Sequence, residues 1–155
     1  MRKTFWIGLL TFTAMICDVT QSSGQQRDVQ EQFVGAWRLA SLELPSADGT
    51  LHTVDCTGLL VYTRDGHMSV QVMERNPQAH PPSAPQQYSQ GGYEASFGTY
   101  DIDEHTHTFT FHVEGALVRT LIGKDLPRAY DLSGNQLIVR STRPDEHWRV
   151  TWQRY

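Results

Sequence analysis

Phe33-Val34-Gly35-Ala36-Trp37-Arg38-Leu39 begins the part of the chain that is patterned like β-strands, and Trp152-Gln153-Arg154 stands near its other end. Gly35 lacks a Cβ, which lets the chain turn tightly into a first strand. An arginine on the last strand can lie across the ring of a tryptophan on the first strand, held by cation–π attraction. The two strands meet in this way if the sheet closes on itself. Gly35, Trp37 and Arg154 therefore form the signature of a closed barrel.

Between these two ends, apolar and polar residues alternate, and no strong helical pattern occurs. We predict strands at residues 37–44, 57–63, 67–73, 93–102, 106–113, 128–132, 136–141 and 147–154. Most are joined by short turns such as Arg64-Asp65-Gly66, whose glycine supplies a positive φ. Residues 115–127 could form a ninth strand or a crossing segment. The expected fold is all-β, a closed antiparallel up-and-down β-barrel of about eight strands in a single domain.

The alternation also predicts which side chains face the interior. On the last strand, one face carries Trp148, Val150, Trp152 and Arg154, and we expect this face to point inward. On the strand that ends at Gly115, one face carries Phe109, Phe111 and Val113, and the other carries Thr108, Thr110, His112 and Glu114. A tight core would turn the aromatic face inward, whereas a ligand-binding barrel could turn the polar face inward. The pattern leaves both arrangements open.

The first 24 residues read as a signal peptide, because Arg2 and Lys3 precede an apolar run, Phe5–Ile16, that is too short to span a bilayer comfortably. Ser22 and Gly24 are the small residues that a signal peptidase requires, so we expect cleavage after Gly24. Residues 25–32 would then lead into a barrel domain at 33–155. The protein is expected to be exported, either secreted or periplasmic.

A lipid anchor at Cys17 is not expected, because Ile16 stands where a small residue would be needed. Cys56 is the other of the two cysteines, so the exported chain could form no internal disulfide. Cys56 could be buried at a strand start or could pair with a second chain, and a monomer and a dimer both remain open. The net charge of −4 and the lack of a basic run give nucleic acid no reason to bind. No membrane span is expected.

Five ordered segments together resemble the family of small proteins with a lipocalin-like domain. They are Phe33 to Leu39, Tyr62 to Gln71, Phe97-Gly98-Thr99-Tyr100, His112-Val113-Glu114-Gly115 and Arg128-Ala129-Tyr130. The resemblance spans almost all of the chain after the expected cleavage site and implies a calycin-type barrel. Two features depart from it, the signal peptide and a proline-rich insertion at residues 74–92. A barrel hosts many functions, so the resemblance says more about fold than about activity.

The resemblance also implies a set of binding residues. The matching segments contribute Tyr100, His112, Glu114, Arg128 and Tyr130. Our hypothesis is that Tyr100, His112, Glu114 and Arg128 form a polar cluster that anchors the carboxylate, hydroxyl or carbonyl of a small, largely apolar ligand. A buried structural network would explain the same residues equally well. No cofactor is implied.

Two other classes of function remain open. In a small barrel enzyme of the isomerase or cyclase type, His112 could move a proton while Glu114 or Tyr100 holds its tautomer. In an interaction scaffold the barrel would only contact another protein, and an exposed apolar patch would reveal it, although the alternation predicts mixed outer faces. We rank the ligand carrier first, the enzyme second and the scaffold third, so no catalytic residue is assigned under the first reading.

Two further sequence features have competing explanations. His105 and His107 have the spacing that puts two imidazoles on one face of a strand, but His105 falls in a turn and no third ligand is in view, so no metal site is expected. The insertion at residues 74–92 contains Pro77, Pro81, Pro82 and Pro85, which exclude a sheet ladder. It could be a lid over the barrel mouth, with Tyr88 and Tyr93 at its end, or a solvated loop.

Overall fold

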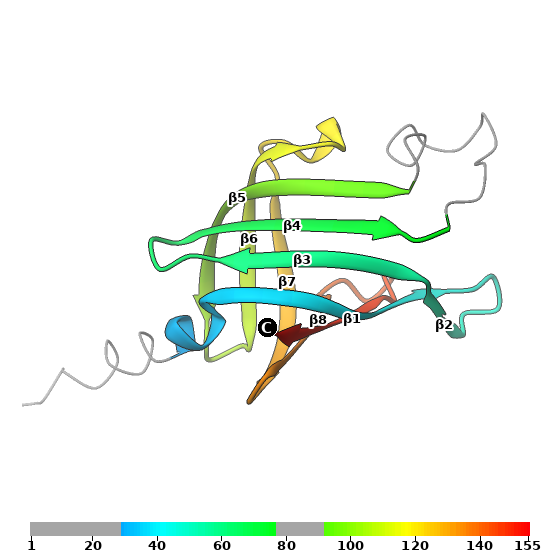
Figure 1. The fold of residues 1–155 in the computed structure, drawn as a ribbon, viewed down its shortest axis with the longest axis horizontal. Coiled ribbons are helices and arrows are strands. Elements are labelled where there is room, and N and C mark those ends of the chain that lie inside the picture. The colour runs from blue at the N-terminus through cyan, green and yellow to red at the C-terminus, as the bar shows by residue number, and fades with distance from the viewer. Residues whose placement is uncertain (1–28, 77–91) are drawn as a thin grey trace, which may run out of the picture.

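A computed structural model of the chain describes residues 29–76 and 92–155. These residues form a β-barrel, in which β1, β3, β4 and β5 lie side by side on the near wall and β6 and β7 cross behind them (Figure 1). The strands are β1 (Gly35–Pro45), β2 (Leu51–Val54), β3 (Cys56–Tyr62), β4 (His67–Glu74), β5 (Tyr93–Asp103), β6 (Thr108–Ala116), β7 (Asp125–Ser133), β8 (Gln136–Ser141) and β9 (Arg149–Arg154). The expected signal peptide, its cleavage site, Cys17 and most of the proline-rich insertion lie outside the described residues.

The sheet closes through β1, which pairs with β3 along one edge and with β9 along the other. Every pairing is antiparallel, and from β3 to β9 each strand neighbours the next along the chain. The prediction of a closed antiparallel up-and-down barrel is therefore confirmed. One short strand was missed: β2 follows the end of β1, where Leu42 faces Val54, and Asp55 separates it from β3.

The segment at 115–127 is divided between its neighbours and forms no separate strand. β6 runs on to Ala116, a 3-10 turn labelled η2 (Arg119–Leu121) follows, and β7 begins at Asp125. The expected turn after β3 is present, and Gly66 has the predicted positive φ of 84°. The connection between β5 and β6 lies slightly later than expected, because β6 begins only at Thr108.

A short helical turn at residues 29–33 closes one end of the barrel, beside the start of β1 (Figure 1). Its last residue, Phe33, is fully buried. The Phe33 ring centroid lies 5.1 Å from that of Tyr62 and 5.0 Å from that of Tyr130, both edge-on, which is a favourable aromatic geometry. We call this the plugged end. The opposite end, where β4 and β8 finish and β5, β7 and β9 begin, is the far end.

Arg154 joins the last strand to the first at the plugged end. Its guanidinium carbon lies 4.2 Å from the centroid of the Trp37 ring, as predicted. The guanidinium also donates hydrogen bonds to the backbone carbonyls of Val34, at 2.7 Å, and of Gln32. Gly35 has a φ of 132°, and a Cβ at this position would lie 2.8 Å from Arg154 Nη1. Glycine is therefore required here both for the backbone conformation and for the approach of the arginine.

The two halves of the barrel interior are packed differently. The four largest fully buried side chains gather toward the plugged end and are Phe33, Trp37, Tyr62 and Leu137. Toward the far end, inward-facing apolar side chains on several strands are only half-buried. They include Val70 and Val72 on β4, Leu126 on β7 and Val150 on β9. The barrel is thus solid at the plugged end and more accessible at the far end.

Substitution of Arg154 by methionine is expected to destabilise the protein by about 2 kcal/mol or more, because it removes a cation–π contact and two charge-assisted hydrogen bonds at once. Chemical denaturation measures this change. Arg38→Met is the matched control, since Arg38 lies on the outer face of the same β1–β9 pair, and it should cost less than about 0.5 kcal/mol. Equal effects of the two substitutions would contradict the assigned role of Arg154.

Candidate functional site

Arg128 lies in the middle of β7 and points into the barrel. It shares a face with Tyr130, which is 4% exposed, and stands opposite Phe109 in the ladder with β6. The arginine itself is half-buried. The inward positions on β7 therefore run from the aromatic Tyr130, near the plugged end, to the cationic Arg128, closer to the far end.

Glu94 is a second inward-facing ionisable group in the same half of the barrel. It lies two residues before Ser96 on the same inward face of β5, and Ser96 is 5% exposed. Glu94 also faces Val72 across the β4–β5 ladder. Burial raises the pKa of Glu94, and the charge of Arg128 partly offsets this rise. Burial likewise lowers the pKa of Arg128, against the opposing charges of Glu146 and Glu94. The charge of each group therefore shifts the pKa of the other inside the barrel.

Trp148 provides the wall against which Arg128 rests. The guanidinium carbon of Arg128 lies 5.1 Å from the Trp148 ring centroid, within the range of a cation–π contact. Trp148 immediately precedes β9, and the expected inward direction of its face brings it to this arginine. Sequence reasoning selected Arg128 but not Glu94 or Trp148 as its companions. Glu94 shares the inward face of β5 with Tyr100, and Trp148 shares that of the last strand with Trp152. The period of two could therefore have indicated both residues.

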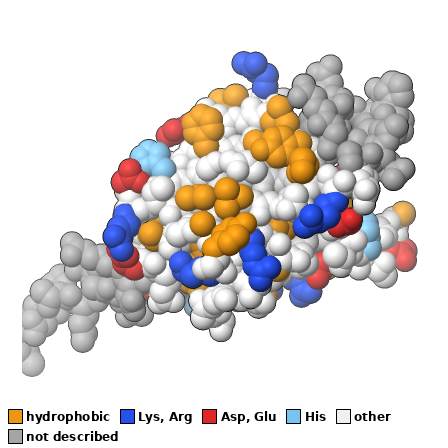
Figure 2. Space-filling model, viewed as in Figure 1, with side chains coloured by type: hydrophobic (Ala, Val, Ile, Leu, Met, Phe, Trp, Pro, Cys, Tyr) orange, Lys and Arg blue, Asp and Glu red, His pale blue; other side chains and the backbone are white. Residues whose placement is uncertain are grey.

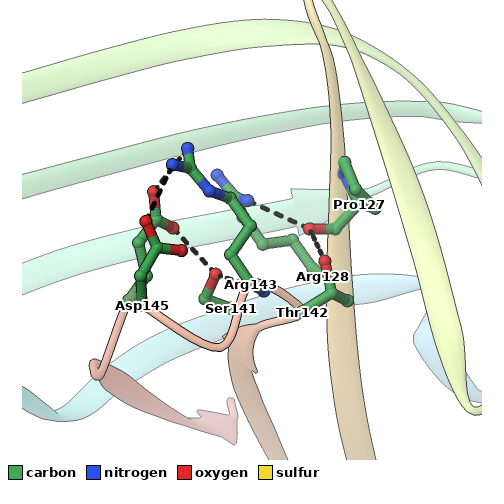
Figure 3. A network of polar contacts seen from close by, with 7 residues as sticks. Pro127, Arg128, Ser141, Thr142, Arg143 and Asp145 are labelled. Carbon is green, nitrogen blue, oxygen red and sulfur yellow. Dashed lines mark hydrogen bonds and ion pairs between the residues drawn. The ribbon is translucent and has the colours of Figure 1, made fainter.

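The connection between β8 and β9 forms an ordered rim beside Arg128 (Figure 3). Arg143 pairs with Glu146 at 2.9 Å and with Asp145 at 3.2 Å. Ser141 donates a 2.7 Å hydrogen bond to Glu146, and this bond is the main reason that the pKa of Glu146 is lowered. These contacts link the two ends of the loop to each other.

A pocket of about 370 Å³ opens against this rim. Its lining comes from the end of β8, the β8–β9 loop, the start of β9 and Leu51 of β2. Trp148 belongs to the lining, so the same ring borders the pocket and contacts Arg128. The lining includes the exposed Arg140 and Arg149 but neither Arg128 nor Glu94, so the pocket lies on the outer side of the rim.

The structure places Tyr100 and Tyr130 in the core of the plugged end. Each is 4% exposed. The Tyr100 hydroxyl donates to the Thr63 carbonyl at 3.1 Å, and the Tyr130 ring packs against Phe33. Burial is the main cause of the raised pKa of both phenols. Both residues face the interior, as a ligand-binding role would need, but their described contacts belong to the plug.

His112 lies on the outer face of β6. Phe109, Phe111 and Val113 occupy the inner face, because burying three large apolar side chains is favoured over burying polar ones. His112 Nδ1 lies 2.7 Å from Asp125 of β7, and Nε2 lies 2.9 Å from Asp101 of β5. The imidazole thus bridges three strands from outside. It and Tyr100 project from opposite faces of the sheet, so the tyrosine does not orient it for acid–base chemistry.

Glu114 also lies outside, at a β-bulge. The register between β5 and β6 shifts here, because Gly98 faces Val113 whereas Phe97 faces Gly115. Glu114 is the extra residue and is exposed. The four residues expected to form one polar cluster are therefore separated: Tyr100 and Arg128 face inward, and His112 and Glu114 face outward. Of the four, Arg128 alone stands at the far end among half-buried inward side chains.

The outer wall over β3, β4 and β5 carries an apolar strip (Figure 2). Phe97 is 55% exposed and Met73 is 43% exposed. Their outward-facing neighbours include Leu59, Val61, Ser69 and Gln71, none of which is charged. Apolar and polar side chains are mixed on this wall, where Ser69 pairs directly with Phe97, but the residues named here carry no charge.

Two further candidates are Cys56 and His107. Cys56 is half-buried at the start of β3, and burial raises the pKa of its thiol. The His107 ring lies 5.7 Å from that of Tyr130, beside the plugged end. Among the described residues, no group of three or more histidine, cysteine or acidic side chains is arranged to hold a metal ion. No helix in residues 29–76 or 92–155 is long and apolar enough to cross a membrane.

A closed antiparallel barrel with one plugged end and an inward-facing charge near the other defines a calycin-type protein, whose architecture supports the binding of small ligands. The sequence model of the lipocalin-like domain matches residues 34–155, and the chain belongs to this family. The match begins just before Gly35 and includes Arg154, so it contains the whole barrel. No curated protein shows a significant sequence match to the chain.

The bridge made by His112 predicts a pH-dependent contribution to stability. Hydrogen bonds to Asp125 and then to Asp101 raise the pKa of His112 above its ordinary 6.5. The contribution is therefore fully present below about pH 6.5 and is lost as the pH rises through the folded-state pKa. His112→Gln should reduce the free energy of unfolding more at about pH 5.5 than at about pH 9. A difference that is constant across this range, measured by urea denaturation, would argue against the bridge.

Proposed function

We propose that the protein binds or carries a small, largely apolar ligand inside the far half of the barrel. The observation that carries this proposal is the partial burial of inward-facing apolar side chains there. A side chain that points into a barrel and is nevertheless accessible faces space that a ligand can fill. Val72, Leu126 and Val150 are such residues on three different strands.

The shape of the site favours a carrier over an enzyme. The plugged end is filled by Phe33 and its aromatic neighbours, so a ligand would reach the interior through the far end. Arg128 would fix its orientation, and the apolar walls would hold its body. His112, the candidate acid–base residue, lies on the outer face of the barrel and does not face the interior.

Export is part of the proposal and rests on the first 24 residues of the sequence. A positively charged start, a short apolar run and small residues before position 25 are the features that a signal peptidase recognises. Fractionation of the native host, followed by mass measurement of the purified protein, tests this directly. A chain that begins at Gln25 outside the cytoplasm supports export, and an intact chain that begins at Met1 in the cytoplasm contradicts it.

Filling the far half of the barrel should weaken ligand binding. Val72→Trp places a large ring in the far half and is expected to weaken the binding of Nile red, a neutral apolar dye, by about tenfold or more. Fluorescence titration measures the dissociation constant. Gln71→Trp adds the same ring to the outer face one residue away, so it should leave the dissociation constant within about twofold of that of the parent protein.

Native mass spectrometry of the protein purified from its own host provides an independent test. A co-purifying small molecule that is lost on denaturation would establish binding and give the mass of the ligand. A clean protein mass, together with Nile red binding that is equal in Val72→Trp and the parent protein, would overturn the proposal. The apolar outer strip would then make an interaction scaffold the better reading.

A further inference from the structure

The charge of Arg128 is incompletely compensated within the barrel. Removing a guanidinium from water is costly unless hydrogen bonds or opposite charges replace the lost hydration. In the described residues, Nη1 donates to the Pro127 carbonyl at 3.0 Å, and the flat face rests on Trp148. No carboxylate oxygen of these residues lies within ion-pair distance of this guanidinium, which keeps donors to spare.

Two other arginines of the barrel have more complete sets of partners. Arg143, on the rim, has carboxylates of Glu146 and Asp145 on its guanidinium (Figure 3). Arg154, in the plug, donates to two backbone carbonyls and lies over Trp37. Arg128 is half-buried like Arg154 but has a single carbonyl partner. Its remaining donors are not taken by the described residues and are therefore open to a ligand.

The acidic groups around Arg128 do not supply the missing partner. Glu146 is already held by Arg143 and Ser141. Glu94 faces the same interior and influences Arg128 only through its charge, without an ion pair. A ligand with one negative charge balances the charge of Arg128.

We propose that the ligand is an amphipathic monocarboxylate whose head group binds Arg128 and whose apolar body lies along the far half of the barrel. This inference rests on the proposed function and adds the chemical class of the ligand. A carboxylate accepts two parallel N–H donors from one guanidinium, which matches the unused donors. Trp148 borders the head group, and Val72 and Leu126 face the apolar body.

Three amphiphiles with the same ten-carbon chain test the charge preference. Decanoate, decanol and decyltrimethylammonium would each displace Nile red from the purified full-length protein. Decanoate is expected to bind at least about tenfold more tightly than decanol, because a charge-assisted pair is roughly twice as strong as a neutral hydrogen bond. Decyltrimethylammonium should bind most weakly of the three.

Arg128→Gln should remove the preference, so that decanoate and decanol bind alike. Arg128→Lys keeps the charge and should retain the preference for decanoate over decanol in reduced form, even if the glutamine variant fails to fold. Arg38→Gln makes the same charge change on the outer wall and should leave the preference intact. Thermal unfolding of each variant verifies that it is folded.

The outcomes separate this inference from the proposal on which it rests. If the parent protein binds decanol as tightly as decanoate, or if Arg128→Gln keeps the preference, the monocarboxylate inference is overturned while the barrel still binds ligands. If neither Nile red nor any of the three amphiphiles binds the parent protein, the proposed function fails, and the inference fails with it.

Discussion

Closure of the sheet at the contact between Trp37 and Arg154 is the constraint on which the rest of the structure depends. A sheet of this length left open would expose two unpaired edges. The barrel removes them by pairing β1 with β9, and Arg154 fastens this seam through its ring contact and its two carbonyl acceptors. Because both carbonyls lie just before β1, the same side chain also fixes the helical turn that carries Phe33. The same arginine therefore stabilises both the β1–β9 seam and the helical turn that plugs the barrel.

The plug determines where function can reside. Aromatic packing around Phe33 consumes the interior of one half, and Tyr100 and Tyr130 belong to that packing. The other half retains half-buried apolar walls, an inward cation and an inward carboxyl group. The tightly packed core therefore lies at one end of the barrel, and the solvent-accessible part of the interior lies at the other. The ordered β8–β9 loop with Arg143 and Glu146 borders the accessible end.

Much of the fold could be predicted from sequence, because it follows from local rules. Alternation identified eight of the nine strands, and the Gly35, Trp37 and Arg154 signature identified the closure. The short β2 was missed because four residues give too little alternation. The site was harder to predict. The sequence offered two possible faces for the strand ending at Gly115, and only the competition for burial places His112 outside. Arg128 and Glu94 influence each other's charge from β7 and β5, two strands that no local pattern connects.

The seam also governs when the fold can form. Trp37 lies near the start of the barrel sequence, and its partner Arg154 lies near the end. The ribosome therefore synthesises Trp37 long before Arg154. During synthesis β1 must wait for β9, and its edge stays unpaired until residue 154 has left the ribosome. The barrel can therefore close only after its last strand has been synthesised.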